Sequence, residues 1–475
     1  MQSSSNANDR TDEALRFVFS FFDAGFDGRK HLPDSQVRKP EVLAKLVHDL
    51  GIAPDPRSTV LVSGSKGKGT TARLIAWSLQ VANQRVGLVV SPEEIQHLDR
   101  IRINNTPITG KQFADIVEEL KQPLLLLAEE NPAPYYHSPS DLFLLIALVW
   151  FSRQKVDCCV LEGGRGVRFD LIGSIDAAVA CVSSVLPEHL HWIGPTIDDV
   201  ACDKLSLLLR SECIVLPASL MAFASHLDSR KSQVEGRVIW LDCVPADSVS
   251  ADSVSADSVA GANDFPDWFL QNARLAQAAI QQLQIKSAGT VYQSIEAMCQ
   301  WGSPSYQALL WPGTATRVFL DGAIDANCFD RRQLARLAGP RCAVVVGLSS
   351  DKASEPLLKL LNEFPFGLIA KIEIISVTAN PVQIRQSPNR HPWLGVIDLS
   401  DAQRPVTNTA QNSQVNRPLD PAHPSAVSPE LQAELFALCG RYETIYFVGI
   451  QLFLRSLRAM LGMQLMGPQS ASIIE

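Results

Sequence analysis

The sequence predicts an α/β fold with parallel sheets, and three observations support this prediction. Short runs of β-branched and other apolar residues recur along the chain. Stretches between them, such as 71–81 and 272–283, carry apolar residues at the three- and four-residue spacing of a helix. At 475 residues the chain exceeds what one core usually holds, so two or three domains are expected. Strands that alternate with helices are typical of parallel sheets covered on both faces.

The expected strands and domains follow from these runs. Strands are expected at 59–63, 86–90, 156–161, 177–182, 214–216, 238–241, 318–320, 343–346, 372–377 and 444–448. A first domain is expected over 1–300 and a second over 301–475. The repeated ADSVS segment within 246–262 has too little apolar mass to pack, so a disordered insertion is expected there. The segment 387–429 is rich in Pro, Asn, Gln and Ser and is expected to be a long loop.

Composition and charge exclude several classes of protein. The net charge of −8 leaves no basic excess for a nucleic acid partner. The longest apolar run, 142–151, is about half of the ~20 residues that span a membrane. The ten cysteines are scattered without a C-x-x-C pair, and no signal peptide is visible. We therefore expect a cytoplasmic protein with reduced thiols, no nucleic acid or membrane partner, and an oligomeric state that the sequence does not indicate.

The stretch after the first expected strand has the composition of a phosphate-binding loop. Its glycines would let backbone N–H groups approach phosphates, and the helix that follows adds partial positive charge at its N-terminus. We expect Lys68 to reach the β- and γ-phosphates of ATP and the Thr70 hydroxyl to ligate Mg²⁺. A flexible loop without a ligand is the alternative. The expected ATP-binding residues of this loop are Gly64, Ser65, Lys66, Gly67, Lys68, Gly69, Thr70 and Thr71.

The segments around this loop resemble the motifs of folylpolyglutamate synthase, a member of the Mur ligase superfamily. The matching segments are the loop, Ser91-Pro92, 99–104 (DRIRIN), 160–170 (VLEGGRGVRFD), Glu188-His189 with Lys204, and 271–273 (QNA). They keep the order and spacing of the family over about residues 12–285. The resemblance implies a P-loop-type parallel-sheet ATPase domain, followed by a smaller Rossmann-like α/β domain. It also implies ATP and Mg²⁺ as cofactors.

The resemblance also implies a set of metal ligands. These are Thr70, Ser91, Glu162, His189 and Lys204. Glu162 has a reason of its own, because a carboxylate at the end of an apolar strand rarely stands without a partner. At the edge of a parallel sheet, beside a phosphate loop, that partner is expected to be Mg²⁺. A salt bridge to Arg165 or Arg168 is the alternative.

Lys204 and Asn272 look ordinary without the resemblance. On its own, Lys204 would be read as a charge on a solvated helix face; the resemblance implies a carbamylated lysine, which turns a cation into an anionic metal ligand. Asn272 is implied to contact adenine, and a helix cap is the equal alternative. A lone histidine such as His189 is usually structural, and the resemblance raises it to a metal ligand. The expected catalytic residues are Lys68, Glu162, His189 and Lys204.

The C-terminal third resembles the family only in outline. Thr314 stands where the family has the arginine of WPGR, and Ile324 replaces the histidine of DGAHNP. Arg317 and Asp321 are the nearest residues that could contact ATP instead, so both are expected in the cofactor site. A solvated position at a strand edge is the alternative for Arg317.

The expected activity is ATP-dependent formation of an amide bond between a carboxylic acid and an amino acid. The reaction would pass through an acyl phosphate and release ADP and phosphate. Glu93 replaces a family histidine, and Ile172-Gly173 replaces a Thr-Asn pair, near the expected substrate. The acid is therefore expected to differ from folate. Folylpolyglutamate synthase proper is the first alternative, and a degenerate nucleotide-binding paralogue without ligase activity is the second.

Overall fold

The structure of the protein is a computed structural model. It describes residues 2–24, 26–29, 31–231, 237–241, 267–283, 309–322, 329, 331–349, 355–375, 393–398, 429–449, 454–455, 457–458 and 461. The expected insertion 246–262 and Ile324 lie outside these residues. The chain divides into two units. The first comprises Met1–Glu93, His97–Trp301 and Met466–Glu475, and the second comprises Glu94–Gln96 and Gly302–Leu465.

The first unit alternates strands and helices along most of its length. Its strands are β1 (Thr59–Ser63), β2 (Val86–Val89), β3 (Ile101–Ile103), β4 (Thr106–Pro107), β5 (Cys158–Glu162), β6 (Ala177–Val182), β7 (Ser211–Pro217) and β8 (Arg237–Leu241). Its α-helices are α1 (Gln2–Asp23), α2 (Phe26–Arg29), α3 (Asp34–Val37), α4 (Pro40–Asp49), α5 (Lys68–Val81), α6 (Gly110–Glu130), α7 (Pro139–Gln154), α8 (Leu190–Ile193), α9 (Ile197–Lys204), α10 (Ala224–Lys231) and α11 (Asp267–Gln282). Short 3₁₀ turns occur at Pro56–Ser58, His97–Arg100, Leu171–Ser174, Leu205–Arg210 and Ala218–Phe223.

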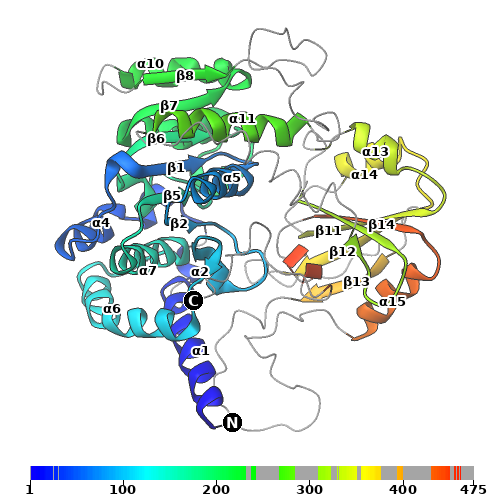
Figure 1. Ribbon diagram of the computed structural model, residues 1–475, viewed down its shortest axis with the longest axis horizontal. Coiled ribbons are helices and arrows are strands. Elements are labelled where there is room, and N and C mark those ends of the chain that lie inside the picture. The colour runs from blue at the N-terminus through cyan, green and yellow to red at the C-terminus, as the bar shows by residue number, and fades with distance from the viewer. Residues whose placement is uncertain are drawn as a thin grey trace. The chain divides into compact units, whose positions relative to one another are not determined.

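These strands form one sheet in the order β4-β3-β2-β5-β1-β6-β7-β8. Six neighbouring strands stack in Figure 1 in the order β2, β5, β1, β6, β7 and β8. Each of these strands pairs with its neighbour in parallel. Only β3 and β4 are antiparallel, at one edge. Because β5, β1 and β6 are parallel neighbours, the loops that follow them emerge at the same edge of the sheet. That edge carries the candidate site.

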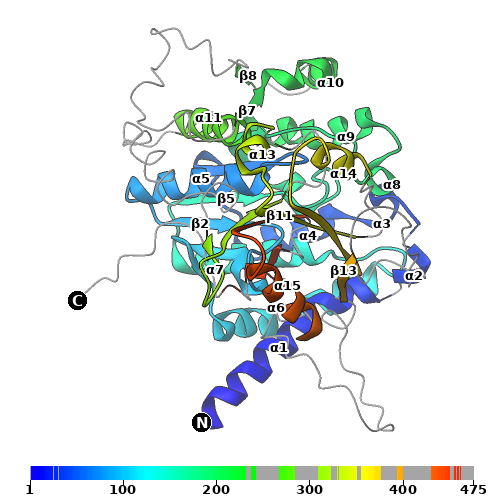
Figure 2. The same cartoon turned by 90° about the vertical axis from the view of Figure 1, so that its right-hand side faces the viewer.

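Both faces of the sheet are buried, as the alternating side chains of the strands require. Val60 and Val62 face a core built with α5 and α11. Leu61 between them faces a second core built with α1, α4, α6 and α7. The long helix α1 packs against α6 and α7 within this second core (Figure 2). Helix α6 begins with a capping box, in which Thr109 and Gln112 satisfy each other's backbone N–H groups.

The second unit contains a smaller sheet with the order β13-β12-β11-β14-β10-β9. Its elements are β9 (Leu309–Leu310), β10 (Arg317–Asp321), α13 (Arg331–Leu337), β11 (Cys342–Ser349), α14 (Glu355–Leu361), β12 (Leu368–Ile375), β13 (Trp393–Asp398), α15 (Pro429–Cys439) and β14 (Thr444–Gly449). All strand pairs in it are parallel except β9 with β10. The expected α/β class is confirmed in both units.

One expectation needs a correction. The segment 387–429 is not a continuous loop, because Trp393–Asp398 forms β13 and pairs with β12. Its sequence, WLGVID, contains enough apolar residues to form an edge strand, although Pro and Asn occur near it in the chain. The short strands β3, β4 and β9 were also not expected, because two or three residues carry no periodic signal.

Two further observations concern the sequence expectations. The cysteines in the described residues are free thiols, and burial raises the pKa of Cys158 and Cys159 to about 12. Such thiols stay protonated and unreactive near neutral pH. Within the described ranges, the structure has no helix with the length and apolar character needed to cross a membrane.

Candidate active site

The expected phosphate loop lies between β1 and α5. Gly64 and Gly67 have φ values of 136° and 85°, which L residues with a side chain rarely adopt. A Cβ atom on Gly67 would lie 2.5 Å from Oδ1 of Asn272, and one on Gly64 would lie 2.2 Å from Oγ of Ser183. Both glycines are therefore required by backbone conformation and by close packing. The helix α5 begins at Lys68, directly after the loop.

The loop is held by hydrogen bonds to the residues that follow β6. The Ser65 N–H donates to the carbonyl of Ser184 at 2.9 Å, and the Lys66 N–H donates to the Ser184 hydroxyl at 2.8 Å. The Ser183 and Ser184 hydroxyls donate to the carbonyl of Lys66. The Leu186 N–H donates to the hydroxyl of Ser65 at 2.9 Å. These bonds fix the loop before any ligand binds.

Lys68 lies beside the backbone of its own loop. Its Nζ atom donates to the carbonyl oxygens of Gly64 at 2.7 Å and Ser65 at 3.4 Å. Thr70 is half-buried in the first turn of α5, where its hydroxyl is available at the helix N-terminus. The first turn of a helix has N–H groups without intrahelical partners, and these attract anions. The loop, Lys68 and this helix end form a site with the chemistry of phosphate binding.

Asn272 lies against this loop from α11. Its side chain is 6% exposed, and its Oδ1 atom lies 3.3 Å from the Thr71 hydroxyl, which donates to it. The helix begins at Asp267, five residues earlier, so Asn272 is not a cap. The helix-cap alternative is therefore wrong. Asn272 instead packs directly over Gly67.

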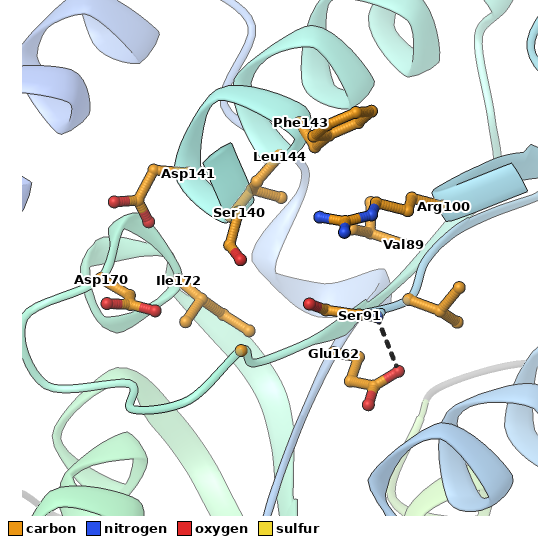
Figure 3. A pocket seen from close by; sticks show the side chains of 12 residues that line it. Val89, Ser91, Arg100, Ser140, Asp141, Phe143, Leu144, Glu162, Asp170 and Ile172 are labelled. Atoms are coloured by element: carbon orange, nitrogen blue, oxygen red, sulfur yellow. Dashed lines mark hydrogen bonds between the residues drawn. The ribbon is translucent and has the colours of Figure 1, made fainter. Parts of the chain in front are cut away.

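Glu162 ends β5, next to the last residues of β1. Its Oε2 atom accepts a hydrogen bond from the backbone N–H of Ser91 at 3.1 Å (Figure 3). It also lies close to the start of α5, because a Cβ atom on Gly69 would be 3.3 Å from Oε2. Burial raises the pKa of Glu162, against the opposing charges of Lys68 and Arg73. A buried carboxylate beside a phosphate loop is suited to a divalent cation.

The alternative partners for Glu162 are engaged elsewhere. Arg165 pairs with Asp34, and its guanidinium lies 4.4 Å from the ring centroid of Trp192. The guanidinium of Arg168 lies 5.3 Å from the ring centroid of Phe169. Neither arginine therefore supplies the salt bridge that was the alternative for Glu162.

Glu188, His189 and Lys204 form the third part of the site. Lys204 is 1% exposed, with Nζ 3.4 Å from Oε1 of Glu188 and 3.3 Å from the carbonyl oxygen of Arg165. Burial, and after it the charge of Lys68, lower the pKa of Lys204 to about 8. Burial opposes ionisation of Glu188, but Lys68, Lys204 and His189 outweigh it and lower the pKa of this carboxyl. Lys68 is thus an electrostatic neighbour of both groups and of Glu162.

A buried charge cluster supports the loop that follows Glu162. Nη2 of Arg38 donates to Oδ2 of Asp141 at 2.9 Å and to Asp170. Asp203, next to Lys204, accepts the N–H groups of Val167 and Arg168, each at 3.0 Å. Unpaired charges of this kind would be costly inside a protein, so the cluster holds the loop in one conformation.

A pocket lies beside Glu162. Phe143, Leu144 and Ile172 give it apolar walls, and Ser91 and Ser140 present hydroxyl groups (Figure 3). Because Glu162 lines it, the pocket adjoins the site that the loop and Glu162 form.

The expected metal ligands are not a ready-made metal centre. Among the described residues, no three His, Cys, Asp or Glu side chains come together in a way that could hold an ion. The reason is the donor set itself, because Thr70 and Ser91 are hydroxyl donors and Lys204 is an amine. Mg²⁺ prefers oxygen ligands and usually keeps phosphate oxygens and waters among them. The residues therefore fit a cation that arrives with a nucleotide.

Arg317 and Asp321 belong to β10 of the second unit. The Nη2 atom of Arg317 donates to the Thr444 hydroxyl at 3.0 Å, and the arginine is exposed. Asp321 is 9% exposed and accepts a hydrogen bond from the Tyr446 hydroxyl. The role of both residues toward ATP stays a prediction.

Sequence reasoning missed several groups near the site. Glu188 stands next to His189 in the same motif, but the resemblance gave a role only to the histidine. Ser183 and Ser184 follow the strand β6, and polar residues at the end of an apolar strand were the available signal. The pairing of Arg38 with Asp141 and Asp170 had no signal, because more than a hundred residues separate them.

The fold and the site define an α/β protein with a phosphate-loop unit and a second, smaller α/β unit. No family model matches the chain. A probable bifunctional folylpolyglutamate synthase/dihydropteroate synthase of Halobacterium salinarum is 33% identical over 201 residues, which are 41% of this chain and 22% of that protein. The dihydrofolate synthase/folylpolyglutamate synthase of Escherichia coli is 30% identical over 167 residues, 34% of this chain and 36% of that protein. The chain thus spans well under half the length of these curated relatives.

Solved structures give the same resemblance over more of the chain. The folylpolyglutamate synthase of Mycobacterium tuberculosis, complexed with ADP and AMPPCP, has a TM-score of 0.67 at 18% identity, covering 94% of this chain and 99% of that one. The apo form of the Lacticaseibacillus casei enzyme has a TM-score of 0.63 at 17% identity, covering 89% of this chain and 95% of that one. At such identities the structures establish the fold alone. The resemblance to folylpolyglutamate synthases that the motifs indicated is confirmed.

Proposed function

We propose that this chain is an ATP-dependent ligase that joins a carboxylic acid to the amino group of an amino acid. The observation that carries the proposal is the gathering of Lys68, Glu162, Glu188 and Lys204 around one glycine loop. Each comes from a different segment of the first unit, and each is at least half-buried. A structural scaffold has no use for two buried carboxylates and two lysines beside a phosphate loop.

The reaction would proceed in two displacements. A carboxylate oxygen of the acid attacks the γ-phosphorus of ATP, and the bond to the bridging oxygen of ADP breaks. The amino nitrogen then attacks the acyl carbon, phosphate leaves, and the nitrogen gives a proton to water. Lys68 and the N-terminus of α5 would neutralise the phosphate charge that shifts in the first step.

Mg²⁺ would supply further charge neutralisation on the phosphates when bound. Glu162, Ser91 and Thr70 would hold one ion with the nucleotide. His189 and a carbamylated Lys204 would hold a second, with Glu188 beside them. Asn272, packed over Gly67, would contact the nucleotide base as the family resemblance implies.

The relatives bear on the identity of the acid. Both curated relatives carry folylpolyglutamate synthase activity in their names, and one solved structure holds L-glutamate with AMPPNP and Mn. These names favour the folate reading over the non-folate acid expected from Glu93 and Ile172. We therefore propose a folate-type acid with glutamate as the first pair to test. The pocket beside Glu162 would receive the body of this acid.

The test is ADP formation with amide product measured by mass spectrometry. Folate or dihydropteroate is supplied with L-glutamate, ATP and Mg²⁺, followed by a panel of other aromatic acids. We expect ADP and amide in equal amounts, and loss of both in Glu162→Gln. Glu118→Gln, an exposed carboxylate on α6, is the matched control that should retain activity. ADP release without an amide product from any acid would contradict the proposal.

A further inference from the structure

The pocket beside Glu162 contains a guanidinium whose charge is already neutralised. Arg100 lines the pocket, and its guanidinium points into it beside Phe143 (Figure 3). Its Cζ atom lies 4.8 Å from the centroid of the Phe143 ring. An arginine in such a position commonly binds an anionic group of a substrate. Arg100, however, already has an anionic partner within the protein, Glu93.

Glu93 forms an ion pair with Arg100 and neutralises the charge of its guanidinium. Nε of Arg100 donates to Oε2 of Glu93 at 2.6 Å, and Nη2 approaches the same oxygen. The other oxygen, Oε1, lies 3.2 Å from Nδ1 of His97. The Glu93 side chain is 1% exposed and that of Arg100 is 12% exposed, so water screens this pair weakly. The guanidinium of Arg100 therefore lines the pocket while its charge is neutralised by Glu93.

The acidic groups of the pocket wall are also compensated. Asp141 and Asp170, which line the pocket, both bond to Arg38. Burial raises the pKa of Asp170, against the opposing charge of Arg38. Apart from Glu162, which faces the phosphate loop, each acidic residue of the described wall thus has a guanidinium partner.

We infer that Glu93 is the specificity-determining residue of this pocket. By neutralising Arg100 it selects an acid whose body, inside the pocket, is uncharged and forms hydrogen bonds. An anionic group there would leave water without gaining a free cation in return. Its binding would therefore be disfavoured relative to an uncharged group of the same shape. The inference rests on the proposed function, because it takes the pocket to be the site of the acid.

Two small probes of equal shape test this charge balance without any turnover. Benzoate and benzamide both have a ring for the apolar walls, and they differ in charge. Their dissociation constants are measured by calorimetry at pH 7.5, and the ratio of the benzamide to the benzoate constant is compared between proteins. In Glu93→Gln, which leaves Arg100 without its counter-charge, we expect this ratio to rise at least about tenfold. Glu118→Gln, the exposed control, should keep the wild-type ratio.

A double variant assigns the effect to the pair. Glu93→Gln/Arg100→Gln removes both charges, and its ratio should return to within about threefold of the wild-type value. If Glu93→Gln does not fold, Arg100→Gln tests the same charge balance by removing the cation of the pair. It leaves a buried carboxylate behind the pocket, so its ratio should fall below that of the wild type.

The outcomes separate this inference from the proposed function. A folded Glu93→Gln protein with an unchanged ratio overturns the inference, and so does an Arg100→Gln protein whose ratio does not fall. Binding of neither probe by any of these proteins overturns it as well, because the pocket would then not accept a ligand of this class. Absence of ligation with every acid would contradict the function instead, and the probe ratios do not depend on that result.

Discussion

The Nζ atom of Lys204 lies 3.4 Å from Oε1 of Glu188, and the lysine side chain is 1% exposed. Burial is the main cause that lowers the pKa of this lysine, to about 8. Only an uncharged amine reacts with CO₂ to give a carbamate. At pH 8 about half of such a lysine is uncharged, whereas a lysine with the ordinary pKa of about 10.4 has well under about 1% in that form. Lys204 is thus prepared for the modification that the family resemblance implies.

Carbamylation of Lys204 should increase with pH. As pH rises from 7 to 9, through the lowered pKa, the uncharged fraction grows, so carbamate should grow at a fixed concentration of dissolved CO₂. The measurement is ¹³C NMR with labelled bicarbonate, in which Lys204→Ala should lose the carbamate signal. The exposed Lys45→Ala protein serves as the control and should keep it. A signal that persists in Lys204→Ala would assign the modification to another lysine.

Loss of Lys204 should also be repaired by a small carboxylate. We expect Lys204→Ala to lose at least about a hundredfold in turnover, because the anionic ligand proposed for the second Mg²⁺ is removed. Formate or acetate should restore part of the activity by occupying the space of the carbamate. Rescue is measured as ADP formation against formate concentration. Full activity without formate would refute the role.

Lys68→Ala should abolish ATP turnover and leave the fold intact. The Nζ atom of Lys68 bonds only to loop carbonyl oxygens among the contacts described, so its removal breaks no buried ion pair. The loss should be at least about a hundredfold, since the lysine neutralises phosphate charge in the transition state. Circular dichroism checks the fold and ADP formation checks the activity. Normal turnover in a folded variant would mean that the loop does not serve ATP.

Gly67→Ala should damage the phosphate loop, whereas Gly28→Ala should not. Residue 67 has φ +85°, and a Cβ atom there would lie 2.5 Å from Oδ1 of Asn272. A residue with a side chain in this conformation costs about 1–3 kcal/mol, in addition to the clash. We therefore expect ATP affinity to fall at least about tenfold. A Cβ atom on Gly28 meets nothing within 4 Å, so this substitution controls for the change itself. Equal ATP affinity in the two variants would contradict the geometry.

Arg38→Met should destabilise the first unit strongly. Arg38 bonds to Asp141 and Asp170 in the interior, and its removal leaves their buried charge without a cation. Breaking a buried pair in this way typically costs about 3–5 kcal/mol. Urea unfolding measures the change in the free energy of unfolding. The exposed Arg57→Met variant is the control and should have the wild-type unfolding midpoint. A wild-type midpoint for Arg38→Met as well would show that Arg38 does not stabilise the fold.

Arg317→Ala tests whether the second unit contributes to ATP binding. If Arg317 supplies the guanidinium that Thr314 lacks, its removal should weaken ATP use at least about tenfold, the equivalent of ~1.4 kcal/mol. In the structure its side chain bonds to the hydroxyl of Thr444 and remains exposed, so it can turn toward a ligand. ATP affinity and turnover are measured beside Lys68→Ala. Wild-type behaviour of Arg317→Ala with an inactive Lys68→Ala would assign ATP to the first unit alone.

Much of the fold could be predicted because its signals are local. The strands at 59–63 and 177–182 begin and end where the apolar β-branched runs do. The helix over 71–81 was expected from its periodicity, and α5 starts only three residues earlier, at Lys68. The phosphate loop was equally visible, since its glycines and lysine are neighbours in the chain. Each of these features depends on residues a few positions apart.

The sequence by itself therefore determined the α/β class, the glycine loop and the resemblance to folylpolyglutamate synthases. Only the tertiary structure decided the electrostatic environment of the site, which comprises the burial and pairing of its charged side chains. The lowered pKa of Lys204 requires that packing exclude water and bring Lys68 and Glu188 close, although 136 residues separate Lys68 from Lys204. Likewise, nothing in the sequence pairs Glu93 with Arg100, and only the folded structure brings them together as a buried, neutralised pair. The physical reason is that hydrophobic periodicity belongs to the local chain, whereas desolvation and charge pairing belong to the folded interior.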